Sequence, residues 1–87
     1  MKKNKEKLYY LNCTQEQKII VCNSLSGLIE SLTDSLSEWD ENMPPLTTMK
    51  KIMSCKTIGR LKKIIERNND LHYCFEVDTE VINNGIH

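Results

Sequence analysis

An apolar stripe whose members are three and four residues apart is the strongest structural signal in the chain. Its steps are 3, 4, 3, 4 and 3 residues, and its members are Cys22, Leu25, Ile29, Leu32, Leu36 and Trp39. This spacing brings the side chains to one face of an α-helix. Further apolar residues at positions 19, 21 and 28 widen the stripe. The pattern predicts a long amphipathic helix packed in a globular domain, over about residues 15–40.

The ends of this predicted helix are marked by capping and helix-breaking residues. Thr14 followed by Gln17 has the spacing of a capping box, in which a hydroxyl and an amide satisfy backbone groups at a helix start. Pro44 and Pro45 end the first half of the chain, because proline cannot continue a helix. The stripe is shorter than the three or four heptads expected of a coiled coil, so it is first interpreted as a core-facing side. The alternative is a homodimer in which the same six residues form the seam.

Two shorter helices are predicted after the prolines, over about residues 47–54 and 57–68. A break between them is required, because in one continuous helix the apolar residues Met49 and Ile58 would face opposite sides. Thr57 lies just before the second apolar stripe and is the expected N-cap of the later helix.

The rest of the chain is predicted as strand and tail. Apolar and polar residues alternate over 71–77, which is typical of a half-buried strand. Residues 78–87 fit either a second strand or a helical turn. Residues 1–7 carry four lysines and one glutamate and are expected to form a flexible basic tail. Because 87 residues make one core of modest size, residues 8–87 are predicted to form a single small α+β domain. In it the long helix and the two shorter ones pack on a short antiparallel sheet or hairpin.

The cysteines indicate a reducing compartment. The gaps between them are 9, 33 and 19 residues, unlike the paired spacing of structural zinc ligands, and they are Cys13, Cys22, Cys55 and Cys74. The alternative is a zinc site formed by these cysteines together with His72.

The apolar run behind the basic N-terminus is too short for a signal peptide, and no run is long enough to cross a bilayer. We therefore expect free thiols, no metal, no membrane contact and a cytoplasmic protein.

Catalytic motifs are missing from the sequence. It has no glycine-rich phosphate loop, no zinc-protease motif, no nucleophile elbow and no C-x-x-C pair. The nearest nucleophilic pair is His72 with Cys74, which on a strand would be too far apart for a direct proton relay. The sequence predicts a protein that is not an enzyme and needs no cofactor.

Charge is segregated along the chain, although the formal net charge is zero. The segment 30–41 has no base, and its acidic stripe is Glu30, Asp34, Glu38, Asp40 and Glu41. The segment 42–67 is strongly basic, and its basic stripe is Lys56, Arg60, Lys63 and Arg67. Steps of three and four residues place each stripe along one helix face. Three interpretations of the stripes are open: they are solvated helix faces, they pair with each other, or they bind a partner. Exposed pairs add only about 0–1 kcal/mol each, so such stripes matter more for recognition than for stability.

These observations predict a non-catalytic protein–protein interaction module. The chain has no alanine beside ten lysines and nine isoleucines, which indicates an AT-rich coding sequence and fits a phage, plasmid or other mobile element of an AT-rich bacterium. We expect a small adaptor or inhibitor that docks on a larger host protein. Its acidic stripe would imitate phosphates and block a host enzyme that handles nucleic acid.

The alternative function is a small helix-turn-helix-like regulator that binds nucleic acid with the basic stripe. The neutral chain and the cramped first helix of the pair count against it, because such domains are generally basic.

Overall fold

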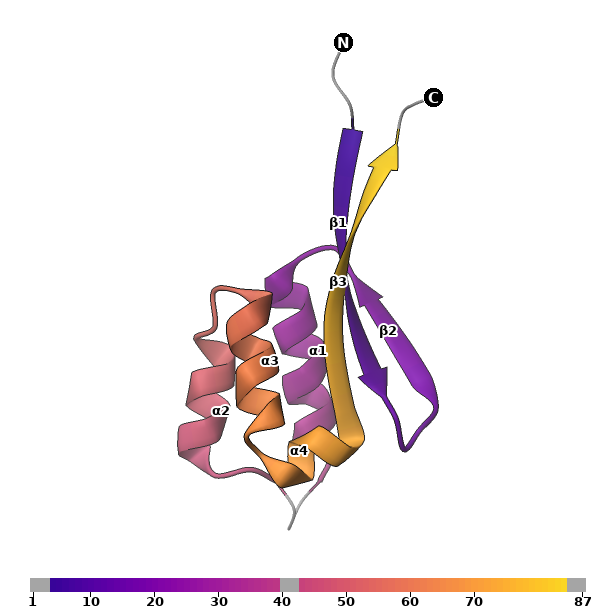
Figure 1. Cartoon of the computed structure of the whole chain (residues 1–87). Coiled ribbons are helices and arrows are strands. Elements are labelled where there is room, and N and C mark those ends of the chain that lie inside the picture. The colour runs from indigo at the N-terminus through magenta and orange to yellow at the C-terminus, as the bar shows by residue number, and fades with distance from the viewer. Residues whose placement is uncertain (1–3, 40–42, 85–87) are drawn as a thin grey trace.

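A three-stranded antiparallel sheet with the strand order β2-β1-β3 organises the chain, and four helices cover one of its faces (Figure 1). The computed structural model describes residues 4–39 and 43–84. Within those ranges the elements are β1 (Asn4–Cys13), β2 (Lys18–Cys22), α1 (Leu25–Ser37), α2 (Leu46–Met53), α3 (Ile58–Glu66), α4 (Asn69–Cys74) and β3 (Phe75–Asn84). The predicted α+β fold class is confirmed. The predicted long helix is confirmed only loosely, because α1 has 13 residues and covers part of the predicted range 15–40.

Strand β1 is the centre of the sheet. It pairs with β3 along its whole length, from Asn4 opposite Asn84 to Cys13 opposite Phe75. Its pairing with β2 covers only residues 9–13. The outer halves of β1 and β3 therefore continue beyond β2 as a two-stranded ribbon that leads toward both termini (Figure 1).

The core lies between the sheet and the helices. Helix α1 packs on β1 and β2, α3 packs on β3, and α2 packs against both α1 and α3. Alternate residues of β1 and β3 point toward the helices, so Leu11 and Phe75 are buried. Trp39, just beyond α1, stacks on Phe75 with ring centroids 5.3 Å apart. The helices contribute the buried residues Leu28, Ile29, Leu32, Leu36, Met49, Ile52, Leu61, Ile65 and Leu71.

Local capping explains where α1 and α3 start. The hydroxyl of Ser24 accepts a hydrogen bond from the backbone N–H of Gly27 at 3.1 Å, which caps α1. The hydroxyl of Thr57 accepts one from the backbone N–H of Arg60 at 3.2 Å, so Thr57 is the N-cap of α3, as its sequence position indicates. Helices α2 and α3 lie close to the expected ranges 47–54 and 57–68.

The expectation of a helix from about residue 15 is wrong for residues 15–24, because α1 starts at Leu25. Residues 14–17 form the turn of a β-hairpin, in which the N–H of Glu16 donates to the carbonyl of Cys13 at 3.1 Å. The residues after the turn belong to β2, whose β-branched side chains alternate between the two sides of the sheet. The capping-box spacing of Thr14 and Gln17 therefore marks a turn here, and pairing with β1 outweighs the helical periodicity.

Two further expectations are wrong at the ends of the chain. Leu71–Cys74, expected in a strand, belongs to α4, where the side chain of Asn68 accepts a hydrogen bond from the N–H of Leu71 at 3.3 Å. The strand starts at Phe75 and runs to Asn84, so residues 78–84 are strand and not a helical turn. Residues 4–7, expected in a tail, are part of β1 because β3 supplies their backbone partners. Residues 1–3 and 85–87 lie outside the described ranges.

The turn generates a prediction about stability. A glycine at this position should change the stability in opposite directions in a hairpin turn and in a helix. Gln17 has a φ of 54°, in the left-handed region that favours glycine. We expect Gln17→Gly to stabilise the fold by about 0.5–1 kcal/mol, whereas glycine inside a helix costs a similar amount. Urea unfolding measures the change, and Gln15→Gly in the same turn is the matched control, with no gain expected. A loss of stability in Gln17→Gly larger than in the control would contradict the hairpin.

Candidate functional site

A groove between α2 and α3 gathers basic side chains from both helices. It has a volume of about 590 Å³ and its basic residues are Lys51, Lys56, Arg60, Lys63 and Arg67. All five side chains are exposed, and none of the described residues that line the groove is acidic. We call this feature the basic groove. It contains the whole basic stripe expected from the sequence, with Lys51 of α2 added.

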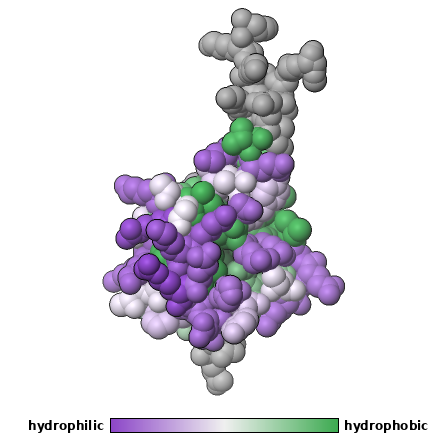
Figure 2. Space-filling model, in the orientation of Figure 1, coloured by the Kyte–Doolittle hydropathy of each residue, from purple (hydrophilic) through white to green (hydrophobic). Residues whose placement is uncertain are grey.

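The groove forms because α2 and α3 are short, adjacent and antiparallel. The two helices run in opposite directions side by side, joined by a tight turn (Figure 1). At the end of α2 the hydroxyl of Ser54 donates to the carbonyl of Lys50 at 2.8 Å, and Thr57 then caps α3. The apolar sides of both helices face the core, so their polar sides flank a shared hollow. Figure 2 shows hydrophilic side chains over this side of the molecule and hydrophobic ones nearer the strands.

The positive charge of the groove is not neutralised by the described part of the chain. The one ion pair found among the described residues joins Lys62 Nζ to Asp78 Oδ1 at 3.2 Å, at the edge of β3 and outside the groove. No described carboxylate lies within ion-pair distance of the five groove bases. Because like charges held together repel, this arrangement favours a bound anion.

The described acids of the acidic stripe lie on a different surface from the groove. Glu30, Asp34 and Glu38 are exposed at the outer side of α1 and its C-cap, opposite the buried leucines of that helix. Asp40 and Glu41 lie outside the described residues. No ion pair joins the two stripes within the described chain, so the described acids of α1 remain available to a partner.

The residues of the predicted dimer seam are used in the core of the chain itself. Ile29, Leu32 and Leu36 are buried, and the other three are partly buried against the core, namely Cys22, Leu25 and Trp39. Cys22 belongs to β2, where its sulfur lies 3.6 Å from the hydroxyl of Ser31. A homodimer built on Ile29, Leu32 and Leu36 would have to open the core, because these three residues form the core-facing side of α1.

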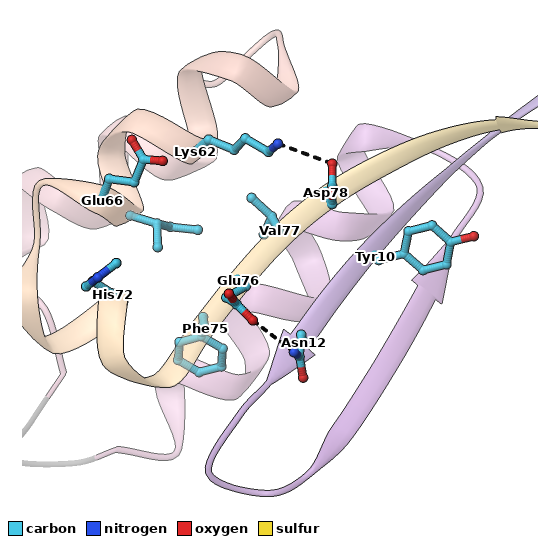
Figure 3. A pocket seen from close by; sticks show the side chains of 10 residues that line it. Tyr10, Asn12, Lys62, Glu66, His72, Phe75, Glu76, Val77 and Asp78 are labelled. Atoms are coloured by element: carbon cyan, nitrogen blue, oxygen red, sulfur yellow. Dashed lines mark hydrogen bonds and ion pairs between the residues drawn. The ribbon is translucent and has the colours of Figure 1, made fainter.

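A second hollow, of about 410 Å³, lies along β3 beside α3 and α4 (Figure 3). Its polar groups are largely engaged with one another. Lys62 pairs with Asp78, and Asn12 Nδ2 donates to Glu76 Oε1 at 3.0 Å (Figure 3). The Tyr10 hydroxyl donates to Glu80 Oε1 at 2.5 Å, which raises the pKa of Tyr10. These contacts tie β3 to its neighbours, which is a structural role.

The candidate nucleophiles show no activation. His72 and Cys74 both lie in α4 and not in a strand. Burial, followed by the charge of Asp70, raises the pKa of the Cys74 thiol, and burial also raises those of Cys13 and Cys55. A reactive cysteine needs the opposite shift. All four cysteines are free thiols.

Neither a cluster of metal-binding side chains nor a membrane-spanning helix is found in the described ranges. Residues 4–39 and 43–84 hold no group of three or more His, Cys, Asp or Glu side chains placed to bind a metal ion. Within the same ranges no helix has the length and apolar character needed to cross a bilayer.

Comparisons with known protein families, with curated proteins and with solved structures found no match to this chain.

Sequence reasoning missed one member of the groove. Lys51 lies on a different helix from the basic stripe, and no helical spacing relates it to Arg60 or Lys63. The signal for its inclusion is the break between the two short helices, since a tight turn brings the end of one beside the start of the next.

Asp78 generates a prediction about acid stability. The N–H of Thr79 donates to its carboxylate at 2.8 Å, and this bond, followed by Lys62, lowers the pKa of Asp78. A lowered pKa in the folded state contributes stability that is present above the unfolded value, near 4, and is lost as the pH falls through the folded value. Asp78→Asn should therefore unfold more easily than wild type at pH 7, with a difference that vanishes in strong acid.

Urea unfolding at a series of pH values measures this difference. In a Lys62→Met background the effect of Asp78→Asn should be smaller, because one of the two groups that stabilise the carboxylate is gone. An effect of Asp78→Asn that stays constant from pH 7 into strong acid would contradict the assignment.

Proposed function

We propose that the chain is a non-catalytic protein-binding module that docks onto an acidic segment of a larger protein through the basic groove. The observation that carries the proposal is a hollow lined by five bases and, among its described lining, no acid. None of those bases is neutralised by a described carboxylate. Charges arranged in this way speed and orient the encounter with an oppositely charged surface.

A partner helix with acidic residues on one face matches the groove in spacing. Arg60 of α3 and its C-cap Arg67 are seven residues apart, and at 1.5 Å per residue this separation is about 10 Å along the axis. Carboxylates at positions i and i+7 of a partner helix have the same separation. Lys63 lies between the two arginines and can meet a carboxylate at i+3 or i+4.

Three features favour a protein over nucleic acid as the partner. The described lining of the groove contains no aromatic side chain on which a base could stack. The antiparallel arrangement of α2 and α3 differs from a helix-turn-helix, whose helices cross at about 90–120°. Exposed acids on α1 and on β3 would repel a polyphosphate chain that extends beyond the groove.

The biological role within this proposal is that of a small adaptor or inhibitor, encoded by a phage, plasmid or other mobile element. The AT-rich composition supports that source. The described acids of the acidic stripe, Glu30, Asp34 and Glu38, support an inhibitor that presents a phosphate-like face to a host enzyme. Their spacing of four residues along α1 gives a row of carboxylates about 6 Å apart.

A second candidate function is binding to nucleic acid, which the same groove favours through its positive charge. Four phosphate contacts would make the affinity fall with salt at a logarithmic slope of about −3.6 on duplex DNA.

The groove generates a binding prediction with defined probes. We expect a labelled helical peptide with glutamates at every third or fourth position to bind more tightly than random duplex or single-stranded DNA, as measured by fluorescence anisotropy. Arg60→Glu with Lys63→Glu should weaken peptide binding about tenfold or more, because two charge pairs of up to about 1 kcal/mol each are lost and replaced by repulsion.

The matched control is Lys7→Glu with Lys50→Glu, which makes the same change in net charge outside the groove lining. This control should change peptide affinity by less than about twofold, because exposed charges outside the groove contribute little to binding. Equal losses in the two double variants, or no peptide binding at all, would overturn the proposal. Tighter binding to duplex DNA, with loss in the groove variant alone, would establish the second candidate function instead.

A further inference from the structure

The outer edge of β2 is an unpaired strand edge. In the order β2-β1-β3 this strand pairs with β1 on one side only. Within the described ranges no strand or helix lies beyond its other side (Figure 1). The outward backbone N–H and C=O groups of β2 therefore lack a described partner, and such a row is a template for another strand.

The sequence of β2 lacks the devices that usually block strand addition. Natural edge strands carry lysines, prolines or bulges along their length. Here the only charge is Lys18 at the first position, and the following residues are Ile19, Ile20, Val21 and Cys22. Ile19 is 63 % exposed and Val21 is 54 % exposed, on the sheet face opposite the helices. Both are large apolar residues with no described neighbour to cover them.

We propose that a second copy of the chain pairs with this edge, antiparallel, about a two-fold axis at Ile20. In that register Ile19 of each copy lies opposite Val21 of the other, and Lys18 lies opposite Cys22. The two exposed β-branched residues of each copy then form one apolar cluster across the axis, and β-branched cross-strand pairs stabilise a sheet. The product is a six-stranded sheet with both sets of helices on one face.

The edge is complementary to itself, and its charges do not oppose pairing with a second copy. The formal net charge of the chain is zero, so two copies do not repel each other at long range. In the proposed register the two Lys18 residues lie at opposite ends of the strand pair. Their separation, four residues at about 3.4 Å each, exceeds the Debye length of about 8–10 Å.

Helix α1 packs closely on the helix-facing side of β2 through small residues. Where α1 meets Cys22 it presents Gly27 and Ser31. A Cβ atom on Gly27 would lie 3.6 Å from the Cβ atom of Cys22, so the contact is close and built from small residues. The basic groove lies between α2 and α3, away from β2, so this inference does not depend on the proposed function.

The test is the mass of the protein in solution, by light scattering or sedimentation, at roughly 100 µM, where a micromolar dimer is populated. Wild type should have twice the 10.1 kDa mass of one chain. Ile19→Lys with Val21→Lys should be monomeric, because the register then places like charges opposite each other twice. Circular dichroism and thermal unfolding establish that this variant is folded.

A charge-swapped variant tests the register itself. Ile19→Lys with Val21→Glu should restore the dimer, because opposite charges then face each other in both pairs. Ile19→Glu with Val21→Glu should be monomeric alone and should form a dimer when mixed with the double lysine variant. A monomeric wild type, a dimer that survives the double lysine substitution, or a charge-swapped variant that stays monomeric would each overturn the inference.

Discussion

Strand β1 lies between β2 and β3, and its pairing with β3 joins the first and last described segments of the chain. All four helices lie between β2 and β3 in sequence, so this pairing closes the loop that contains them. It also gives the polar residues at the start of β1 their backbone partners. The buried side chains Leu11 and Phe75 connect the pairing to the core, where Phe75 stacks on Trp39. Loss of the β1–β3 pairing would separate β3 and α3, which packs on it, from β1 and β2, on which α1 packs.

Packing on a single face of the sheet determines which surfaces are exposed. The apolar sides of α1, α2 and α3 are used in one core, so their charged sides face outward. This arrangement keeps the acidic stripe on α1 apart from the basic groove between α2 and α3, and no described ion pair joins them. The opposite face of the sheet carries no helix, which exposes Ile19 and Val21. A chain of zero net charge thus presents surfaces of distinct chemistry.

Periodicity predicted the elements whose stability is largely local and misplaced those that depend on distant partners. The stripe from Leu25 to Leu36 and the cap at Thr57 were identified because side-chain spacing and capping act within a few residues. The strand at 18–22 was missed because its structure depends on pairing with β1, which outweighs helical spacing. For the same reason the strand that begins at Phe75 was placed too early. At the site, four of the five groove bases follow from sequence spacing in and beside α3, and Lys51 follows only from the tertiary contact of α2 with α3.

The most direct test of the central claim, that the basic groove is the docking surface, is a ¹H–¹⁵N NMR titration with the acidic helical peptide. Backbone amides at and beside Lys51, Lys56, Arg60, Lys63 and Arg67 should show the largest chemical-shift changes. Amides of β2 and of the outer side of α1 should change little. Changes concentrated on α1 or β2, with the groove amides unaffected, would contradict the account.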